Sequence, residues 1–239
     1  MAALPEKARV VIIGQGGIVG ASVAHHLVQN GWDDIVGLEK SAIPTDIGST
    51  SHASDFCYMT SHDKLNVFTS TYSREFYKSR GNFIEIGGME VARKGDDAQV
   101  QELLRKVGSG KAFGTNAHMI TAAEAKERFP LLEEDTIECA MWDPDAGLVT
   151  PRSQKVAGDL VDEAVAAGKL QAFPYTPAEE IIVEDGRAVG VKTAKGTIMA
   201  DHVVLCVGIW GSLVSETANV KLPLMPVEHP LLFFGPWDA

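Results

Sequence analysis

The sequence predicts an α/β fold, in which helices pack on the faces of a parallel sheet. Residues 10–13 form a short apolar run that ends in glycines, as a strand buried on both faces does. A helical pattern follows and closes at Asn30 and Gly31, a typical C-cap. A second short strand is expected at residues 35–38. This order of strand, glycine turn, helix and strand predicts a βαβ unit with parallel strands.

The remaining elements follow from spacing and turn signals. Helical spacing predicts helices at residues 63–80, 96–107 and 153–167. Thr121 and Glu124 form a capping box, and the helix they begin should end before Pro130. Residues 46–55 should form a polar loop and 141–147 a turn. Strands are expected at residues 87–92, 180–184, 188–193, 197–199 and 203–208, and residues 223–234 should be extended.

Composition excludes several classes of protein. The 239 residues carry a net charge of −11, so a basic surface for nucleic acid is not expected. The three cysteines form no CxxC pair, which argues against a zinc site or a disulfide framework, and no metal site is expected. No apolar run approaches the ~20 residues of a membrane span. With no leader visible before the first strand, we expect a cytoplasmic protein without a membrane partner.

The glycine turn has the position of a dinucleotide-binding fingerprint. Glycines let the backbone approach a pyrophosphate, and the following helix offers free N–H groups at its positive end. The pattern G-x-G-x-x-G is not matched strictly, because the turn contains one extra residue. Glu39, directly after the second strand, could accept hydrogen bonds from ribose hydroxyls, and it disfavours the 2′-phosphate of NADP. The turn does not distinguish NAD from FAD as the cofactor. Its residues are Gly14, Gln15, Gly16, Gly17, Ile18, Val19 and Gly20.

His52 lies in a loop of small hydroxyl residues after the second strand. In a Rossmann-type arrangement this loop runs along the carboxyl edge of the sheet, towards a redox ring. An imidazole there can act as a nucleophile towards an activated methyl group. By spacing alone, a structural or surface histidine is the commoner explanation.

Several motifs together resemble the dimethylglycine and sarcosine dehydrogenase/oxidase group of the glycine-oxidase-like FAD-dependent oxidoreductases. The histidine loop, residues 48–53 (GSTSHA), is the most specific of them. The likeness covers nearly the whole chain but only the N-terminal part of the family's chain. The other matching segments are residues 14–20, 87–92, 122–132, 142–147 and 207–211.

This resemblance implies FAD as the cofactor, bonded covalently through a ring nitrogen of His52 to the 8α-methyl group of the flavin. It implies that Phe56 lies near the flavin ring and that the backbone of Ala178 meets the adenine. Further residues that should line the FAD are Ile18, Val19, Glu39, Lys40, Ser49, Thr50 and Ser51.

The resemblance also implies a fold and a reaction. The fold is a Rossmann-like FAD/NAD(P)-binding domain, residues 1–86 and 150–215, with a discontinuous α+β substrate domain at 87–149 and 216–239. The substrate domain is expected to be incomplete, because the family's chain continues further. The reaction is oxidation of a small N-methylated amine, with hydride transfer to the flavin. His229 is the candidate base, since a neutral amine reacts and a free histidine has a pKa of about 6.5.

Two alternatives remain open at this stage. One is a truncated, non-catalytic remnant that binds a nucleotide or a protein partner. The other is an NAD-linked dehydrogenase, which the histidine loop disfavours. The sequence identifies neither the amine nor the electron acceptor.

Overall fold

The computed structural model describes residues 3–228 and residue 230, and the chain divides into two compact units. The first unit comprises Met1–Ser54 and Arg152–Ala239, and the second comprises Asp55–Pro151. Residues 55–86, expected in the cofactor domain, group by their contacts with the second unit, whereas residues 216–228, expected in the substrate domain, group with the first. The cofactor and substrate roles expected of the two domains stay predictions.

The first unit contains a six-stranded sheet in the order β10-β11-β12-β1-β2-β9. At its centre β1 (Lys7–Ile13) pairs in parallel with both β2 (Ile35–Leu38) and β12 (Gly196–Leu205). The parallel βαβ unit expected from the sequence is therefore present. The outer strands are β9 (Leu170–Phe173), parallel to β2, and the antiparallel hairpin of β10 (Ala178–Glu184) and β11 (Arg187–Thr193).

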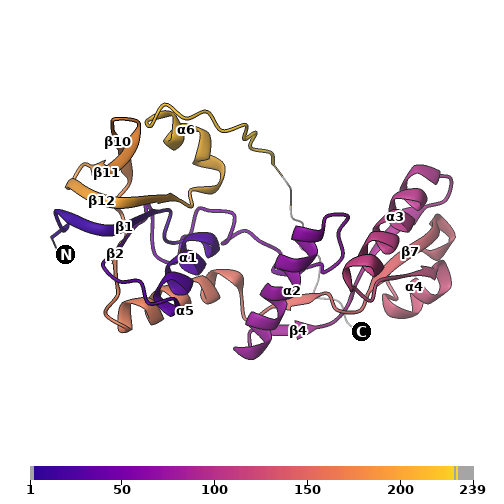
Figure 1. The fold of residues 1–239 in the computed structure, drawn as a ribbon. Coiled ribbons are helices and arrows are strands. Elements are labelled where there is room, and N and C mark those ends of the chain that lie inside the picture. Colours follow the sequence, from indigo (N-terminus) through magenta and orange to yellow (C-terminus); the bar gives the residue numbers. More distant parts are fainter. Residues whose placement is uncertain (1–2, 229, 231–239) are drawn as a thin grey trace. The chain divides into compact units, whose positions relative to one another are not determined.

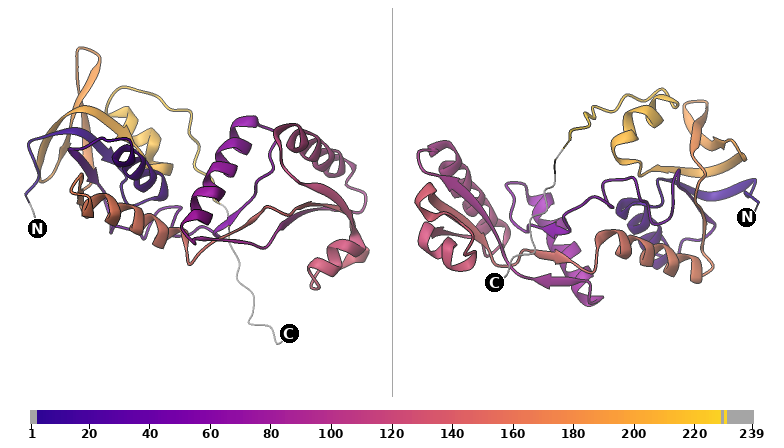
Figure 2. Two further views of the ribbon diagram at one scale, coloured as in Figure 1. Left: turned by 60° about the horizontal axis from the view of Figure 1, so that its bottom comes forward. Right: turned by 180° about the vertical axis from the view of Figure 1, so that it is seen from behind.

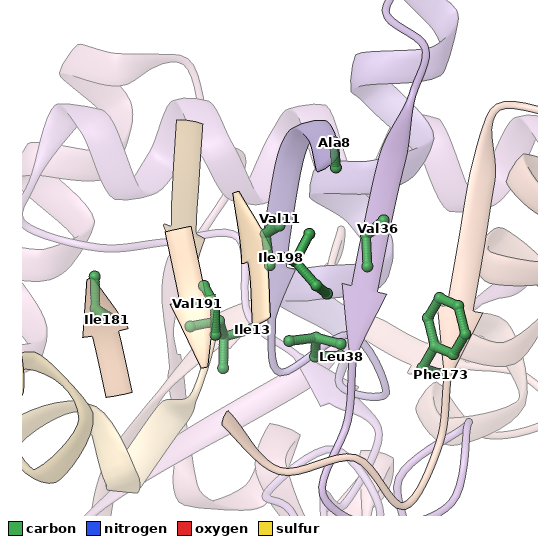
Figure 3. Close-up of a cluster of buried hydrophobic side chains, with 9 residues drawn as sticks. All are labelled: Ala8, Val11, Ile13, Val36, Leu38, Phe173, Ile181, Val191 and Ile198. Atoms are coloured by element: carbon green, nitrogen blue, oxygen red, sulfur yellow. The ribbon is translucent and has the colours of Figure 1, made fainter. Parts of the chain in front are cut away.

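Helices cover both faces of this sheet. Val11 and Ile13 join a buried cluster on one face (Figure 3), where Val214 of α6 (Gly211–Glu216) packs against them. Because side chains alternate along a strand, Val10 and Ile12 point to the other face. There α1 (Ile18–Gln29) packs against α5 (Ser153–Ala166), as Figure 1 shows. Residues 10–13 are buried because both faces are covered.

The second unit contains two small antiparallel sheets. In one, β7 (Ile137–Asp143) lies between β5 (Gly88–Arg93) and β6 (His118–Thr121). Met141 packs with α3 (Asp97–Phe113), whereas its neighbour Ala140 packs with α4 (Ala122–Arg128), so the two helices cover opposite faces of the sheet (Figure 2). The Thr121–Glu124 capping box is confirmed. The other elements are β3 (Phe56–Cys57), α2 (Lys64–Ser79), β4 (Phe83–Glu85), η1 (Glu134–Thr136) and β8 (Gly147–Val149).

Three sequence predictions were wrong in detail. The strands expected at 197–199 and 203–208 are one strand, β12, whose first part pairs with β11 and whose remaining part, from Met199 to Leu205, pairs with β1. Residues 141–143, expected in a turn, complete β7. Residues 223–228 and 230 have no regular structure, and the rest of the segment expected to be extended lies outside the described residues.

Three segments leave the first unit's sheet at one edge. Ile13 pairs with Leu38 on one side and with Leu205 on the other. Gly14, Glu39 and Cys206 therefore follow adjacent strand ends. In open α/β sheets, ligands bind outside the carboxyl ends of the strands. This edge is the candidate functional site.

Candidate functional site

The glycine turn after β1 is packed too closely for side chains at its first and last glycines. A Cβ on Gly14 would lie 2.4 Å from the carbonyl oxygen of Cys206, and Gly14 has a φ of +90°. A Cβ on Gly20 would lie 2.2 Å from the carbonyl oxygen of Gly14. The close approach of α1 to β1 and β12 thus depends on bare backbone at both positions.

The extra length of the turn is taken up by Gln15, whose side chain is fully buried beneath it. Its Nε2 atom donates to the carbonyl of Gly20 at 3.3 Å. Gly37 of β2 makes room for it, since a Cβ there would lie 2.5 Å from the Gln15 Cγ. Among the described residues, the Gln15 Oε1 atom has no hydrogen-bond partner. The added residue therefore enters the protein interior, between α1 and the sheet.

The N-terminus of α1 is held by the histidine loop. Gly17 is the N-cap and has no side chain to cap the helix. Instead the Ile18 N–H donates to the Thr50 Oγ1 at 3.0 Å. The next residue, Val19, is 60% exposed at the mouth of the turn. The first turn of a helix attracts anions through its free N–H groups and its dipole. Thr50 thus fixes the loop to the point where a pyrophosphate would bind.

Glu39 links the glycine turn to the loop after β2. Its side chain is almost completely buried, with 6% of the residue exposed. Oε2 accepts the Gly16 N–H at 2.9 Å, and Oε1 accepts the Ser41 N–H at 3.1 Å. Oε1 also accepts the Ser41 hydroxyl at 3.4 Å, whereas Oε2 keeps a further lone pair that can accept a ribose hydroxyl. The structure adds a bridging role to the ribose contact that the sequence predicts.

Lys40 lies on the indole of Trp210, with its Nζ 3.3 Å from the ring centroid. Burial lowers the pKa of the Lys40 amine, against the opposing effect of the Glu39 carboxylate. Trp210 belongs to the short helix η2 (Gly208–Trp210) after β12. The sequence does not predict a place for this tryptophan in the site, and the structure brings it there. Its position just past the end of β12 is the signal that could have found it.

The loop around His52 is a pair of overlapping tight turns. The Ser51 and His52 N–H groups donate to the carbonyls of Gly48 and Ser49, at 3.1 and 3.2 Å. The exposed imidazole places Nδ1 3.1 Å from the Gly48 carbonyl and 3.0 Å from the Ser51 Oγ. A carbonyl oxygen only accepts, so Nδ1 carries the hydrogen, and in the neutral ring the lone pair is on Nε2.

The remaining predicted residues are distributed over the chain. Ala178 opens β10, and just before it the Thr176 N–H donates to the Glu39 carbonyl at 2.7 Å. That contact places the β9–β10 connection beside Glu39. Phe56 belongs to the second unit, where its ring lies against Tyr58 and above Gly88. His229 lies outside the described residues.

The residues at this edge fit the adenosine diphosphate part of a dinucleotide. The turn presents bare backbone at Gly14, Gly16 and Gly20, and a helix N-terminus follows it. A buried carboxylate lies beside the turn. A fingerprint of this kind is shared by NAD and FAD enzymes. Comparison with known proteins decides between them.

Residues 9–239 match the family described as FAD dependent oxidoreductase. The chain belongs to this family. The match selects FAD over NAD, which the turn had left open, and it confirms the resemblance expected from the sequence. No comparison supports the alternative of a non-catalytic remnant.

Two curated relatives and one solved structure illustrate the likeness. The chain is 30% identical to the mouse mitochondrial pyruvate dehydrogenase phosphatase regulatory subunit, over 99% of this chain and 27% of that protein. It is 29% identical to human mitochondrial sarcosine dehydrogenase, over 95% of this chain and 25% of that protein. The L-proline dehydrogenase of P. horikoshii matches with a TM-score of 0.81 and 30% identity, over 91% of this chain and 57% of that one.

The chain thus spans about a quarter of the length of these two curated relatives. Among the residues that the structure describes, no helix is both long and apolar enough to cross a membrane.

Proposed function

We propose that this protein is an FAD-dependent oxidoreductase that oxidises a small N-methylated amine or amino acid, similar to sarcosine or dimethylglycine. The observation that carries the proposal is the match of residues 9–239 to the FAD-dependent family, with the glycine turn and Glu39 arranged for a dinucleotide. The likeness to sarcosine dehydrogenase and the histidine loop support the choice of substrate class.

Each part of the site has a proposed role towards FAD. Gly14, Gly16, Gly17 and Gly20, with the N-terminus of α1 at Ile18 and Val19, hold the pyrophosphate. Glu39 accepts the ribose hydroxyls, while Lys40 and the backbone of Ala178 lie along the adenine side. Ser49, Thr50 and Ser51 supply hydroxyl groups near the phosphates, and Phe56 is proposed to lie close to the flavin ring. Bound FAD supplies the acceptor for a hydride from the carbon next to the amine nitrogen.

His52 is proposed as the covalent anchor of the flavin. The hydrogen bonds at Nδ1 leave the lone pair of the neutral imidazole on Nε2, so Nε2 is the atom that bonds to the 8α-methyl carbon. Because the ring is exposed, this nitrogen is accessible to a cofactor. His229 remains the candidate base that keeps the substrate amine neutral.

Anaerobic reduction of the bound flavin tests the substrate class. Purified protein loaded with FAD is mixed with sarcosine or dimethylglycine, and the flavin absorbance is followed. We expect bleaching with both, but none with trimethylglycine, whose quaternary nitrogen has no neutral form. A flavin that no N-methyl amino acid bleaches would contradict the proposed substrate. Failure to bind FAD at all would contradict the proposed cofactor.

A further inference from the structure

The loop that carries His52 is anchored at its two ends by side chains from the start of α5. The Gln154 Nε2 donates to the carbonyl of Thr45 at 2.7 Å, at the beginning of the loop. At the other end, one guanidinium nitrogen of Arg152 lies 3.4 Å from the Ser51 carbonyl and 3.5 Å from the Ala53 carbonyl. These two carbonyls belong to the residues on either side of His52.

Of the two contacts from α5, the one made by Arg152 acts on a part of the loop that the other anchors do not hold. Thr45 also donates its N–H to the Gly16 carbonyl at 2.9 Å, and Thr50 accepts the Ile18 N–H. Those bonds fix the loop to the glycine turn. Within residues 48–52 the bonds are local and set the orientation of the imidazole relative to its own turn. Arg152 alone among these groups holds the backbone on both sides of His52.

Loop segments are mobile unless their backbone is held. Formation of a bond between two groups requires them to be held close to the reacting geometry, and a displacement of about 1 Å can cost about a hundredfold in rate. A histidine on a long loop therefore needs an external anchor if it is to attack one carbon of a bound cofactor.

We propose that Arg152 and Gln154 are positioning residues for flavin attachment, which orient the histidine loop without touching the flavin. This inference rests on the proposed covalent role of His52. In the step it concerns, a bond forms between the His52 Nε2 and the 8α carbon. The 8α-methyl group loses a proton to solvent, the imidazolium loses the proton of Nδ1, and two electrons pass to the flavin, which dioxygen then reoxidises.

The test compares attachment rates in the full chain. Protein produced under riboflavin limitation is mixed with FAD in air, and flavin that survives acid precipitation is measured over time. We expect Arg152→Ala to slow attachment about tenfold or more, Gln154→Ala to slow it less, and Arg152→Lys to recover part of the loss. Lys155→Ala, which alters an exposed ion pair with Asp159 on the same helix, is the matched control and should attach flavin at the wild-type rate.

Two further readouts distinguish positioning from a general structural role. Reversible FAD affinity, measured in the His52→Ala background where no bond can form, should stay within about twofold on adding Arg152→Ala. The melting temperature of apoprotein should also be unchanged. Equal attachment rates in wild type and Arg152→Ala would overturn the inference and leave the proposed function standing. A loss of FAD affinity or of stability that accounts for the slower attachment would have the same two consequences. Absence of covalent flavin in the wild type would overturn the inference together with the proposed covalent role of His52, whereas the proposed amine oxidation is tested separately by anaerobic reduction of the flavin.

Discussion

At the residue scale, Glu39 is a buried acidic group that connects two segments of the candidate site. Its buried carboxylate accepts one N–H from the glycine turn and one from the loop after β2. The same group is proposed to receive the ribose of FAD. Stability of the turn and affinity for the cofactor should therefore change together when this side chain is altered.

Replacement of Glu39 with glutamine tests this coupling. The amide keeps the size of the side chain but replaces one of the two acceptor oxygens with an NH2 group. One of the two backbone N–H groups then faces a donor and loses its acceptor. A buried donor without an acceptor costs about 1–3 kcal/mol. We expect Glu39→Gln to lose that much unfolding free energy in urea and to bind FAD more weakly in a fluorescence titration. Glu179→Gln, at an exposed position of β10, is the control and should change neither.

The place of Glu39 in the site was predictable from the sequence, whereas the positions of the Gln15 and Trp210 side chains were not. Glu39 could be found because an acidic residue directly after the second strand of a βαβ unit has a known geometric role. The buried position of the Gln15 side chain could not be predicted, because it depends on Gly37, a glycine of β2 that is distant in sequence. The contact of Trp210 with Lys40 was not predictable either, because the two residues are distant in sequence.

Gln15 and Gly37 form a packed pair that a double-mutant cycle can measure. Gly37→Ala would place a Cβ 2.5 Å from the Gln15 Cγ, so the buried amide must move. We expect this change to cost about 1–3 kcal/mol of unfolding free energy, as overpacking of a core does. Gln15→Ala removes the obstructing atoms, and Gly37→Ala should cost less in that background. Additive costs in urea denaturation would mean that the two positions do not interact.

At the element scale, the fit of α1 against β1 depends more on Gly20 than on Gly17. A Cβ on Gly20 would lie 2.2 Å from a backbone carbonyl oxygen, whereas one on Gly17 would lie 3.5 Å from the Thr50 Oγ1. Gly20→Ala must therefore displace the helix from the sheet, while Gly17→Ala needs no displacement.

We expect Gly20→Ala to weaken FAD binding by about tenfold or more, because the helix N-terminus moves away from the pyrophosphate. Gly17→Ala should bind FAD within a few fold of wild type. Titration of both apoproteins with FAD measures the difference. Equal affinities would show that the separation of α1 from the sheet does not determine cofactor binding.

The elements themselves were largely predictable where local pattern decided them. The strand, helix and strand at residues 7–38 and the capped helix at 122–128 follow from periodicity and caps. The four-residue strand β9 was missed because it pairs with β2, which is far away in sequence. Strand β12 was divided in two because the polar pair Asp201 and His202 interrupts its apolar pattern.

At the scale of the whole molecule, the sequence predicted a discontinuous first unit that resumes near residue 150, but not that the second unit begins at Asp55. Residues 55–86 group with the second unit because β3 and β4 pair with β8, a strand encoded some distance later. The spacing of apolar residues within each strand does not indicate which strands pair. Family membership, in contrast, was predictable, because the histidine loop and the glycine turn lie in one short stretch of the chain.

FAD is proposed to be held at the glycine turn and bonded to His52. The most direct measurement is proteolysis of the FAD-loaded protein, followed by mass spectrometry of the flavin-fluorescent peptide. We predict a flavin adduct on the peptide that contains His52, and its loss in His52→Ala with dissociable FAD retained. Flavin that is released completely on denaturation of the wild type, or an adduct on another residue, would contradict the claim.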